Sequence, residues 1–294
     1  MPRIFHLSDI HFGLEDTAML AWVKERIADE RPDAVAITGD LTMRARVREF
    51  AAATAWIASL DLPVTVEVGN HDLPYFNLPE RFVDPYRRFR DIEALIERTI
   101  ELPGQPAGLP AGHLPGVAIV PLKTTARAQW RLNWSKGWIT ADALRDTLDR
   151  IDALPPGTQA LVAAHHPLVE TGTHGTALTR GGQRALEELA KRPVLAVLSG
   201  HVHDPFDLEH QTCNGPVRMI GAGTLSKRIR STPASFNDLL IADGTIRVRV
   251  RNLEYVPTRD MMIDDVPADA MPPRKPDEPV APIGAVPAVD PPVY

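Results

Sequence analysis

The sequence predicts an α/β protein in which parallel strands bring polar residues to one shared edge. In the first third of the chain, short apolar runs alternate with longer runs whose apolar residues recur at helical spacing, which is typical of βαβ units. Five apolar runs along the chain end in residues that bind hard metal ions. Nearer the C-terminus, strand-like runs joined by turns predict a second sheet packed against the first.

The first three strands are expected at Arg3–Ser8, Ala34–Thr38 and Val64–Val68. Between them, Asp16–Glu30 and Arg44–Ser59 place their apolar residues on one helical face. A strand–helix–strand–helix–strand order implies parallel strands joined by right-handed crossovers.

The alternation breaks between residues 73 and 116, which we interpret as an insertion. Residues 79–101 predict a helix, and residues 103–116 are rich in proline and glycine. The insertion either covers the site or forms a plain surface helix with a loop. Its arginines are candidates for contact with an anionic substrate group or belong to a solvated helix face, and they are Arg81, Arg87, Arg88 and Arg90.

The alternation then resumes in the second half of the chain. Its expected elements are a strand at Val117–Pro121, a helix beginning at Thr140, a strand at Ala160–Ala164, a helix at Gly182–Lys191 and a strand at Val194–Ser199. Three more strand-like runs follow at Arg218–Gly221, Ser235–Ile241 and Thr245–Asn252. We expect these last three to form the second sheet as a meander.

Two parts of the chain differ in composition, and we expect a catalytic domain over residues 1–256 and a tail over 257–294. Ten of the 38 residues in the tail are proline. Aromatic residues are nearly absent there, and such a stretch does not continue a sheet.

Composition narrows the class of protein. The net charge of -6 offers no basic surface for a nucleic-acid polymer. The chain has no apolar run of about 18 residues that could span a bilayer. Cys213, the single cysteine, cannot form an internal disulfide, and a metal site built without thiolates suits a reducing compartment. We therefore expect a cytoplasmic protein, with homo-oligomerisation left open.

The polar ends of five strands describe a cage for two metal ions. They are Asp9-Ile10-His11, Gly39-Asp40, Gly69-Asn70-His71-Asp72, His165-His166 and Gly200-His201-Val202-His203. Because the carboxyl ends of parallel strands share a crevice, we expect these residues to converge. Imidazole and carboxylate ligands suit Mn, Fe, Zn and Co. Gly39, Gly69 and Gly200 would let the backbone bend sharply. Taken singly, Asp9 and Asp40 could be helix N-caps instead.

In this order, the five motifs resemble the calcineurin-like metallophosphoesterase family over roughly residues 3–252. The resemblance implies a four-layer α/β/β/α sandwich of two packed mixed sheets, with a dinuclear metal site at the carboxyl ends of the strands. It assigns one metal ion to Asp9, His11, Asp40 and His203. It assigns the other to Asp40, Asn70, His165 and His201, so that Asp40 bridges the pair.

The resemblance also implies hydrolysis at phosphorus, because two ions about 3.5–4 Å apart can hold a phosphate and generate hydroxide near neutral pH. His71 would donate a proton to the leaving oxygen or hydrogen-bond the transition state, and we expect Asp72 to orient its ring. The substrate-binding residues are unknown, with His71, His166 and His174 as candidates. His166 could instead lie behind the ligands or pack away from them.

Several motifs resemble the branch of the family that contains cyclic-nucleotide and glycerophosphodiester phosphodiesterases. We therefore predict hydrolysis of a small phosphodiester to a monoester and an alcohol. The alternatives are a phosphomonoesterase or nuclease of the same family, or a non-catalytic scaffold that binds a protein partner.

Overall fold

The computed structural model describes residues 1–74, 77–104, 116–127, 135–173 and 179–253. One of its two sheets is mixed and has five strands, which come from the beginning and the end of the described chain. Its strand order is β11-β10-β1-β2-β3. The bounds are β1 (Arg3–Leu7), β2 (Ala34–Ile37), β3 (Val64–Val66), β10 (Ser235–Ala242) and β11 (Thr245–Asn252). As predicted, β1, β2 and β3 are parallel, whereas β10 and β11 are antiparallel to their neighbours.

The other sheet is also mixed and has six strands from the middle of the chain, in the order β4-β5-β6-β7-β9-β8. The bounds are β4 (Ile100–Leu102), β5 (Val117–Leu122), β6 (Gln159–Ala164), β7 (Val194–Ser199), β8 (Phe206–Thr212) and β9 (Gly215–Gly221). The four inner strands are parallel, and both edge strands are antiparallel.

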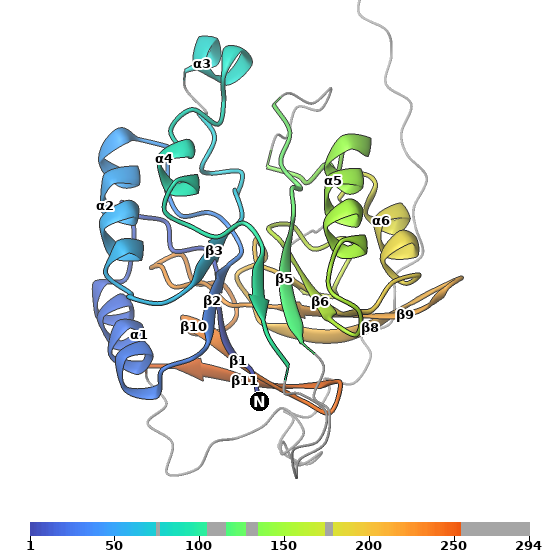
Figure 1. Ribbon diagram of the computed structural model, residues 1–294. Helices are drawn as coiled ribbons and strands as arrows, with labels where there is room; N and C mark the ends of the chain where they lie inside the picture. The colour runs from blue at the N-terminus through green and yellow to red at the C-terminus, as the bar shows by residue number, and fades with distance from the viewer. Residues whose placement is uncertain (75–76, 105–115, 128–134, 174–178, 254–294) are drawn as a thin grey trace, which may run out of the picture.

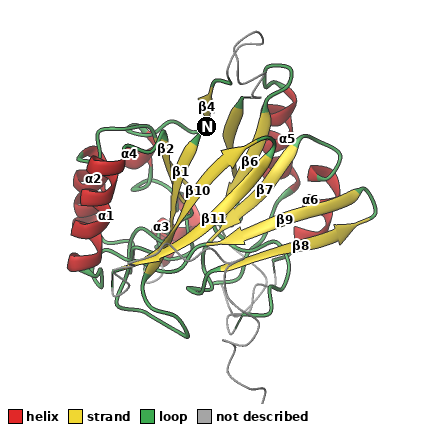
Figure 2. Cartoon of the chain, turned by 90° about the horizontal axis from the view of Figure 1, so that it is seen from below, coloured by secondary structure: helices red, strands yellow, loops and turns green. Residues whose placement is uncertain are grey.

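Helices cover the outer face of each sheet (Figure 1 and Figure 2). The helices beside the first sheet are α1 (Thr17–Glu30) and α2 (Val47–Ala58), and those beside the second are α5 (Ala141–Asp152) and α6 (Gly182–Leu189). Two short helices, α3 (Leu78–Val83) and α4 (Arg90–Glu93), come from the segment expected to be an insertion. The layer order confirms the α/β/β/α sandwich.

Three apolar clusters hold the layers together. One lies between the sheets and includes Ile4, Leu161 and Leu198. The others pack α1 and α2 on the first sheet and α5 and α6 on the second. Each fully buried aliphatic side chain stabilises the fold by about 1.5–3 kcal/mol relative to an exposed one. The clusters therefore stabilise both sheets and, with them, the positions of the residues at the strand ends.

The helix N-caps decide between two interpretations of the first two carboxylates. Asp16 caps α1 by accepting hydrogen bonds from the backbone N–H groups of Ala18 and Met19, and α2 begins after Arg46. Asp9 and Asp40 therefore cap neither helix, and both side chains are buried.

The prediction that the last strands form the second sheet as a meander is wrong. The hairpin of β10 and β11 adds to the first sheet, with His6 of β1 opposite Asn237 of β10. Arg218–Gly221 lies in β9 of the second sheet, next to β8, a strand that we did not predict. Local patterns specify a hairpin but not the sheet that it joins.

The single helix predicted over residues 79–101 is also wrong. The chain forms α3, α4 and then β4, which pairs with β5 at the edge of the second sheet. Asp84 ends α3, and Ile100 is already buried in the core between the sheets.

Three of the four candidate arginines in this segment make close hydrogen bonds or ion pairs with other residues of the chain. Arg81 is only 1% exposed and donates to the carbonyl oxygens of Ala126 and Arg127, which follow β5. Arg88 pairs with Glu80 at 2.6 Å, and Arg90 pairs with Asp84 at 2.5 Å. Burial removes Arg81 from the candidates for an anionic substrate group, and the ion pairs of Arg88 and Arg90 favour the alternative interpretation as a helix surface without substrate contact.

Each helix in the described ranges falls short of the length and apolar character needed to cross a lipid bilayer. The tail expected at residues 257–294 lies outside the described residues.

Candidate metal centre

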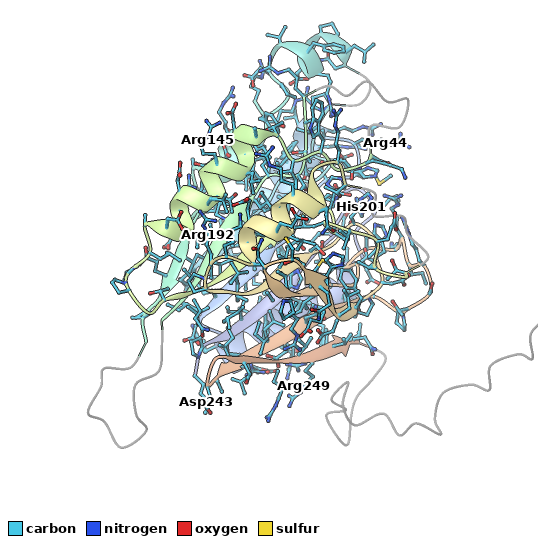
Figure 3. The ribbon with its side chains drawn as sticks, turned by 90° about the vertical axis from the view of Figure 1, so that its right-hand side faces the viewer. Arg44, Arg145, Arg192, His201, Asp243 and Arg249 are labelled. Carbon is cyan, nitrogen blue, oxygen red and sulfur yellow. The ribbon has the colours of Figure 1, made fainter. Side chains whose placement is uncertain are left out.

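The loops that follow β1, β2, β3, β6 and β7 meet beyond the carboxyl ends of these strands. The backbone N–H of Asp9 donates to the carbonyl of Gly39 at 3.1 Å, and that of Gly200 donates to the carbonyl of His165 at 2.9 Å. Figure 3 labels Arg192 before β7 and His201 after it, at the two ends of that strand. All seven predicted ligand residues lie on these five loops.

One group of ligand atoms comes from Asp9, His11 and His203, which can hold a metal ion together. The Nε2 atoms of the two histidines are 3.3 Å apart. Asp9 Oδ1 lies 3.1 Å from His203 Nε2 and 3.6 Å from His11 Nε2.

A second group lies beside it and shares Asp40. Asp40 Oδ1 is 3.4 Å from His165 Nε2, and that nitrogen is 3.2 Å from Asn70 Oδ1. Asp40 Oδ2 faces the first group, 3.8 Å from His11 Nε2. The ring of His201 lies 5.2 Å from that of His165, measured between centroids. The two oxygens of Asp40 therefore face different groups, as expected of a bridging ligand.

The Nδ1 atoms of three ligand histidines are held by backbone carbonyl oxygens. The pairs are His165 with Thr38 at 2.7 Å, His203 with Arg228 at 2.7 Å, and His11 with Thr42 at 3.4 Å. Because a carbonyl only accepts, Nδ1 carries the hydrogen in each ring. When the ring is neutral, Nε2 then directs its lone pair into the site, as metal-binding histidines require.

The cluster fits a pair of cations, because its inward atoms are acceptors that face one another. Asp9 Oδ1 is buried and has no hydrogen-bond donor among the described residues. Its partner oxygen Oδ2 accepts from the Ser8 hydroxyl at 2.6 Å and from the backbone N–H of His201 at 2.8 Å. Buried acceptors in contact repel one another unless a proton or a metal ion lies between them.

The backbone at the ligands is unusual. Five of the seven predicted ligand residues have positive φ, and they are Asp9 (53°), His11 (51°), Asp40 (51°), His201 (68°) and His203 (63°). Positive φ is uncommon for non-glycine residues, and Asp and His adopt it more readily than most others. It turns each side chain out of the alternation of the preceding strand and toward the shared crevice.

We expected a sharp backbone bend at Gly39, Gly69 and Gly200, but the three glycines have different roles. Only Gly39 has positive φ, at 88°. A Cβ atom on Gly200 would lie 1.7 Å from Ser8 Oγ and 2.5 Å from Asp9 Oδ2. A Cβ atom on Gly69 would lie 2.1 Å from Asp40 Oδ1. These two glycines are needed because the ligand carboxylates pack directly on their backbone.

The charges of the cluster set the pKa values of its histidines. Burial acts to lower the pKa of His165, but the Asp40 carboxylate outweighs it and raises the pKa to about 9. Against the same effect of burial, Asp9 raises the pKa of His203. Burial lowers the pKa of His11 to about 4 and that of His201 to about 3. A bound metal would take the place of the protons on His165 and His203.

His71 lies at the edge of this cluster. Its Nδ1 donates to the carbonyl of Met43 at 2.8 Å, and its ring makes an edge contact with that of His11. Nε2 therefore faces the site and lies 3.1 Å from Nη1 of Arg228. Sequence patterns did not indicate Arg228, since a lone arginine in a loop carries no signal of its own.

Asp72 does not orient the ring of His71, which corrects the role that we expected. Its Oδ1 accepts from the backbone N–H and the hydroxyl of Thr42, and its Oδ2 accepts from the N–H groups of Leu41 and Gly69. Burial raises the pKa of Asp72 to about 6. Asp72 thus joins the loops after β2 and β3, and the carbonyl of Met43 holds the ring.

The two remaining histidine candidates have different outcomes. His166 is buried behind the ligands, with Nδ1 2.8 Å from the Thr124 hydroxyl and Nε2 2.8 Å from the carbonyl of Ser135. Its ring lies 4.5 Å from that of His201, so it supports that ligand. His174 lies outside the described residues.

A two-sheet sandwich with this His/Asp cluster defines the class of dinuclear metallohydrolases that the resemblance implied. The profile of the calcineurin-like phosphoesterase family matches residues 2–205. The chain belongs to this family, whose members use two divalent metal ions.

Two solved structures have a similar fold. A dimetal phosphatase from Danio rerio is 13% identical, with a TM-score of 0.60, over 85% of this chain and 96% of that one. The purple acid phosphatase PPD1 from yellow lupin (Lupinus luteus) seeds is 14% identical, with a TM-score of 0.55, over 85% of this chain and 51% of that one. No curated protein matches the chain. At these identities the likeness establishes the fold alone.

Proposed function

We propose that the protein hydrolyses a small phosphodiester, such as a cyclic nucleotide or a glycerophosphodiester, to a monoester and an alcohol. Family membership supports phosphoric ester hydrolysis. The diester preference is supported by the resemblance of the motifs at Leu7–His11, Gly39–Thr42 and Gly69–Asp72 to the phosphodiesterase branch of the family.

The metal ligands would divide as the two groups of atoms divide. Asp9, His11, Asp40 and His203 would hold one ion, and Asp40, Asn70, His165 and His201 the other. The nitrogen and oxygen donors suit Mn, Fe, Zn or Co. When bound, the ions supply positive charge for the phosphoryl oxygens and a nucleophile near neutral pH.

His71 would serve the leaving group. In the balanced reaction, water adds to phosphorus, the bond from phosphorus to the ester oxygen breaks, and that oxygen needs a proton. Because Nδ1–H is held by the carbonyl of Met43, Nε2 is the atom that can present a proton to the site. Such general-acid assistance typically contributes about 10²–10⁴-fold in rate.

The test compares two ester classes after reconstitution with each metal. We expect the protein to hydrolyse bis(p-nitrophenyl) phosphate with kcat/KM at least about tenfold above that for p-nitrophenyl phosphate, which is a difference of about 1.4 kcal/mol in transition-state binding. A larger value for the monoester would contradict the diester preference. No turnover of either ester with any of the four metals would favour the scaffold alternative.

A further inference from the structure

We propose that Arg228 binds a non-bridging phosphoryl oxygen of the substrate at the edge of the metal centre. This residue lies in the loop between β9 and β10, where no predicted motif placed a substrate contact. The inference rests on the proposed phosphoester substrate and adds the residue that recognises its phosphate. The same contact would form with a phosphodiester, with the monoester product and with inorganic phosphate, because each carries a non-bridging anionic oxygen.

The guanidinium of Arg228 points to the residues that flank the cluster. Its Nη1 lies 3.1 Å from Nε2 of His71, 3.4 Å from Nε2 of His11 and 3.9 Å from Sδ of Met43. His71 is the residue that would serve the leaving group, and His11 is a metal ligand. A phosphate held between these two side chains would therefore have one of its oxygens within reach of Arg228.

The charge of Arg228 is not neutralised by an ion pair with any carboxylate in the described part of the chain. Its side-chain contacts among the described residues are two imidazole nitrogens and a thioether sulfur, none of which carries a negative charge. The lone pair of His11 Nε2 is assigned to the metal, so this contact is not available once the site is loaded. The planar guanidinium can donate two parallel hydrogen bonds to the oxygens of an anionic phosphate, which it binds better than these neutral groups.

The backbone of Arg228 is fixed to the metal ligands. Its carbonyl oxygen accepts from Nδ1 of His203 at 2.7 Å, and its N–H donates to the Ser226 hydroxyl at 3.2 Å. That hydroxyl lies 2.7 Å from the hydroxyl of Thr224, which in turn donates to the carbonyl of Asp9 at 2.7 Å. The base of the side chain thus keeps a constant position relative to two ligands, as a substrate-positioning residue requires.

Three variants separate this role from a structural one. Arg228→Ala removes the guanidinium and keeps the backbone carbonyl that orients His203. Arg228→Lys keeps a charge but loses the fork geometry. Arg230→Ala is the matched control, because Arg230 is exposed in the same loop, two residues along the chain.

The first readout is binding of inorganic phosphate to the metal-loaded proteins, measured by calorimetry, together with metal content. We expect Arg228→Ala to keep the wild-type metal content and to weaken phosphate binding about tenfold or more, as for loss of a hydrogen bond to a charged group. Arg228→Lys should recover part of the affinity, and Arg230→Ala should match the wild type. Unchanged phosphate affinity in Arg228→Ala would overturn the proposal.

The second readout is turnover of bis(p-nitrophenyl) phosphate. A rise in KM parallel to the loss of phosphate affinity supports a positioning role. A fall in kcat with unchanged KM and unchanged phosphate affinity would show that Arg228 acts only through His71, and the proposal would be wrong. If the wild type binds phosphate but hydrolyses only monoesters, the diester preference fails while the assignment of Arg228 is still decided by the first readout.

Discussion

Left-handed backbone at five ligand residues is a local cost of about 1–2 kcal/mol for each non-glycine residue. The fold tolerates it because the sheets and the hydrogen bonds between the loops hold these residues in place. The conformation lets residues that follow five different strands aim at one point. Strain concentrated at ligand positions therefore supports a functional interpretation of the cluster.

Asp40→Ala tests the shared ligand. Asp40 presents one oxygen to His165 and the other to His11, so we expect its removal to abolish binding at both metal positions. Metal content after reconstitution and desalting, measured by mass spectrometry, checks this. Asp16→Ala is the control, because it removes the N-cap of α1 and costs about 1 kcal/mol of stability without touching the site. Retention of two ions by Asp40→Ala would contradict the bridging role.

His71→Ala tests the proton donor. We expect wild-type metal content and a rate loss of about 10²–10⁴-fold for an alkyl leaving group, which needs a proton. The loss should be much smaller for p-nitrophenolate, which leaves without one. His210→Ala, which changes a half-buried histidine of β8 away from the cluster, should alter neither rate. Equal losses for the two leaving groups would exclude proton donation as the main role of His71.

The sequence predicted which residues would cluster at the strand ends, but not the contacts that hold them. Asp9, Asp40 and His165 were found because strand ends carry a recognisable local pattern. Met43 and Arg228 contact His71 through loops that are 28 and 157 residues away from it in sequence. No short-range pattern encodes such contacts, and for the same reason Asp72 was given a role that belongs to a backbone carbonyl.

At the scale of elements, the contact between β7 and β1 joins the two sheets at the site. Gly200 follows β7, and its backbone lies against Ser8 and Asp9, which follow β1. The close approach fixes the distance between the ligands on one sheet and those on the other. A side chain at this position would push the sheets apart where the metal ligands meet.

Gly200→Ala is therefore expected to reduce stability and metal affinity together. The added Cβ would lie 1.7 Å from Ser8 Oγ, and overpacking of this kind typically costs about 1–3 kcal/mol. Urea unfolding and metal titration measure the two effects. Gly157→Ala is the control, because its φ of 84° makes alanine strained while nothing lies within 4 Å of the new Cβ. A variant that loses stability but binds metal like the wild type would show that the ligands do not depend on this contact.

At the scale of the whole molecule, the sequence predicted the order of the layers better than it predicted which strands belong to each sheet. The parallel strands and their helices follow from periodicity, which is local. The pairing of β10 with β1 joins residues 231 positions apart, as His6 and Asn237 illustrate through a 3.3 Å side-chain contact. Asp243-Gly244 predicts the hairpin of β10 and β11, but only the three-dimensional packing places that hairpin beside β1.

The buried charges of the metal centre also predict how the stability of the whole metal-free protein depends on pH. The pKa of His165 rises from 6.5 to about 9 on folding, against burial, because of Asp40. A base with a raised folded pKa stabilises the protein fully below its unfolded pKa, and this contribution is lost as pH rises through the folded pKa. We therefore expect the free energy of unfolding to fall between pH 7 and pH 9.5, by on the order of 1–3 kcal/mol.

Urea unfolding of metal-free protein at these two pH values measures this loss, and His165→Gln should show a weaker dependence because it cannot titrate. A bound metal takes the place of the protons, so the loaded protein should gain stability relative to the metal-free form as pH rises. Equal pH dependence in the wild type and His165→Gln would contradict the charge coupling of His165 with Asp40. If the stabilisation by metal is also unchanged between pH 7 and pH 9.5, then metal binding displaces no proton from the cluster, and the mutually facing acceptors are not the ligand atoms.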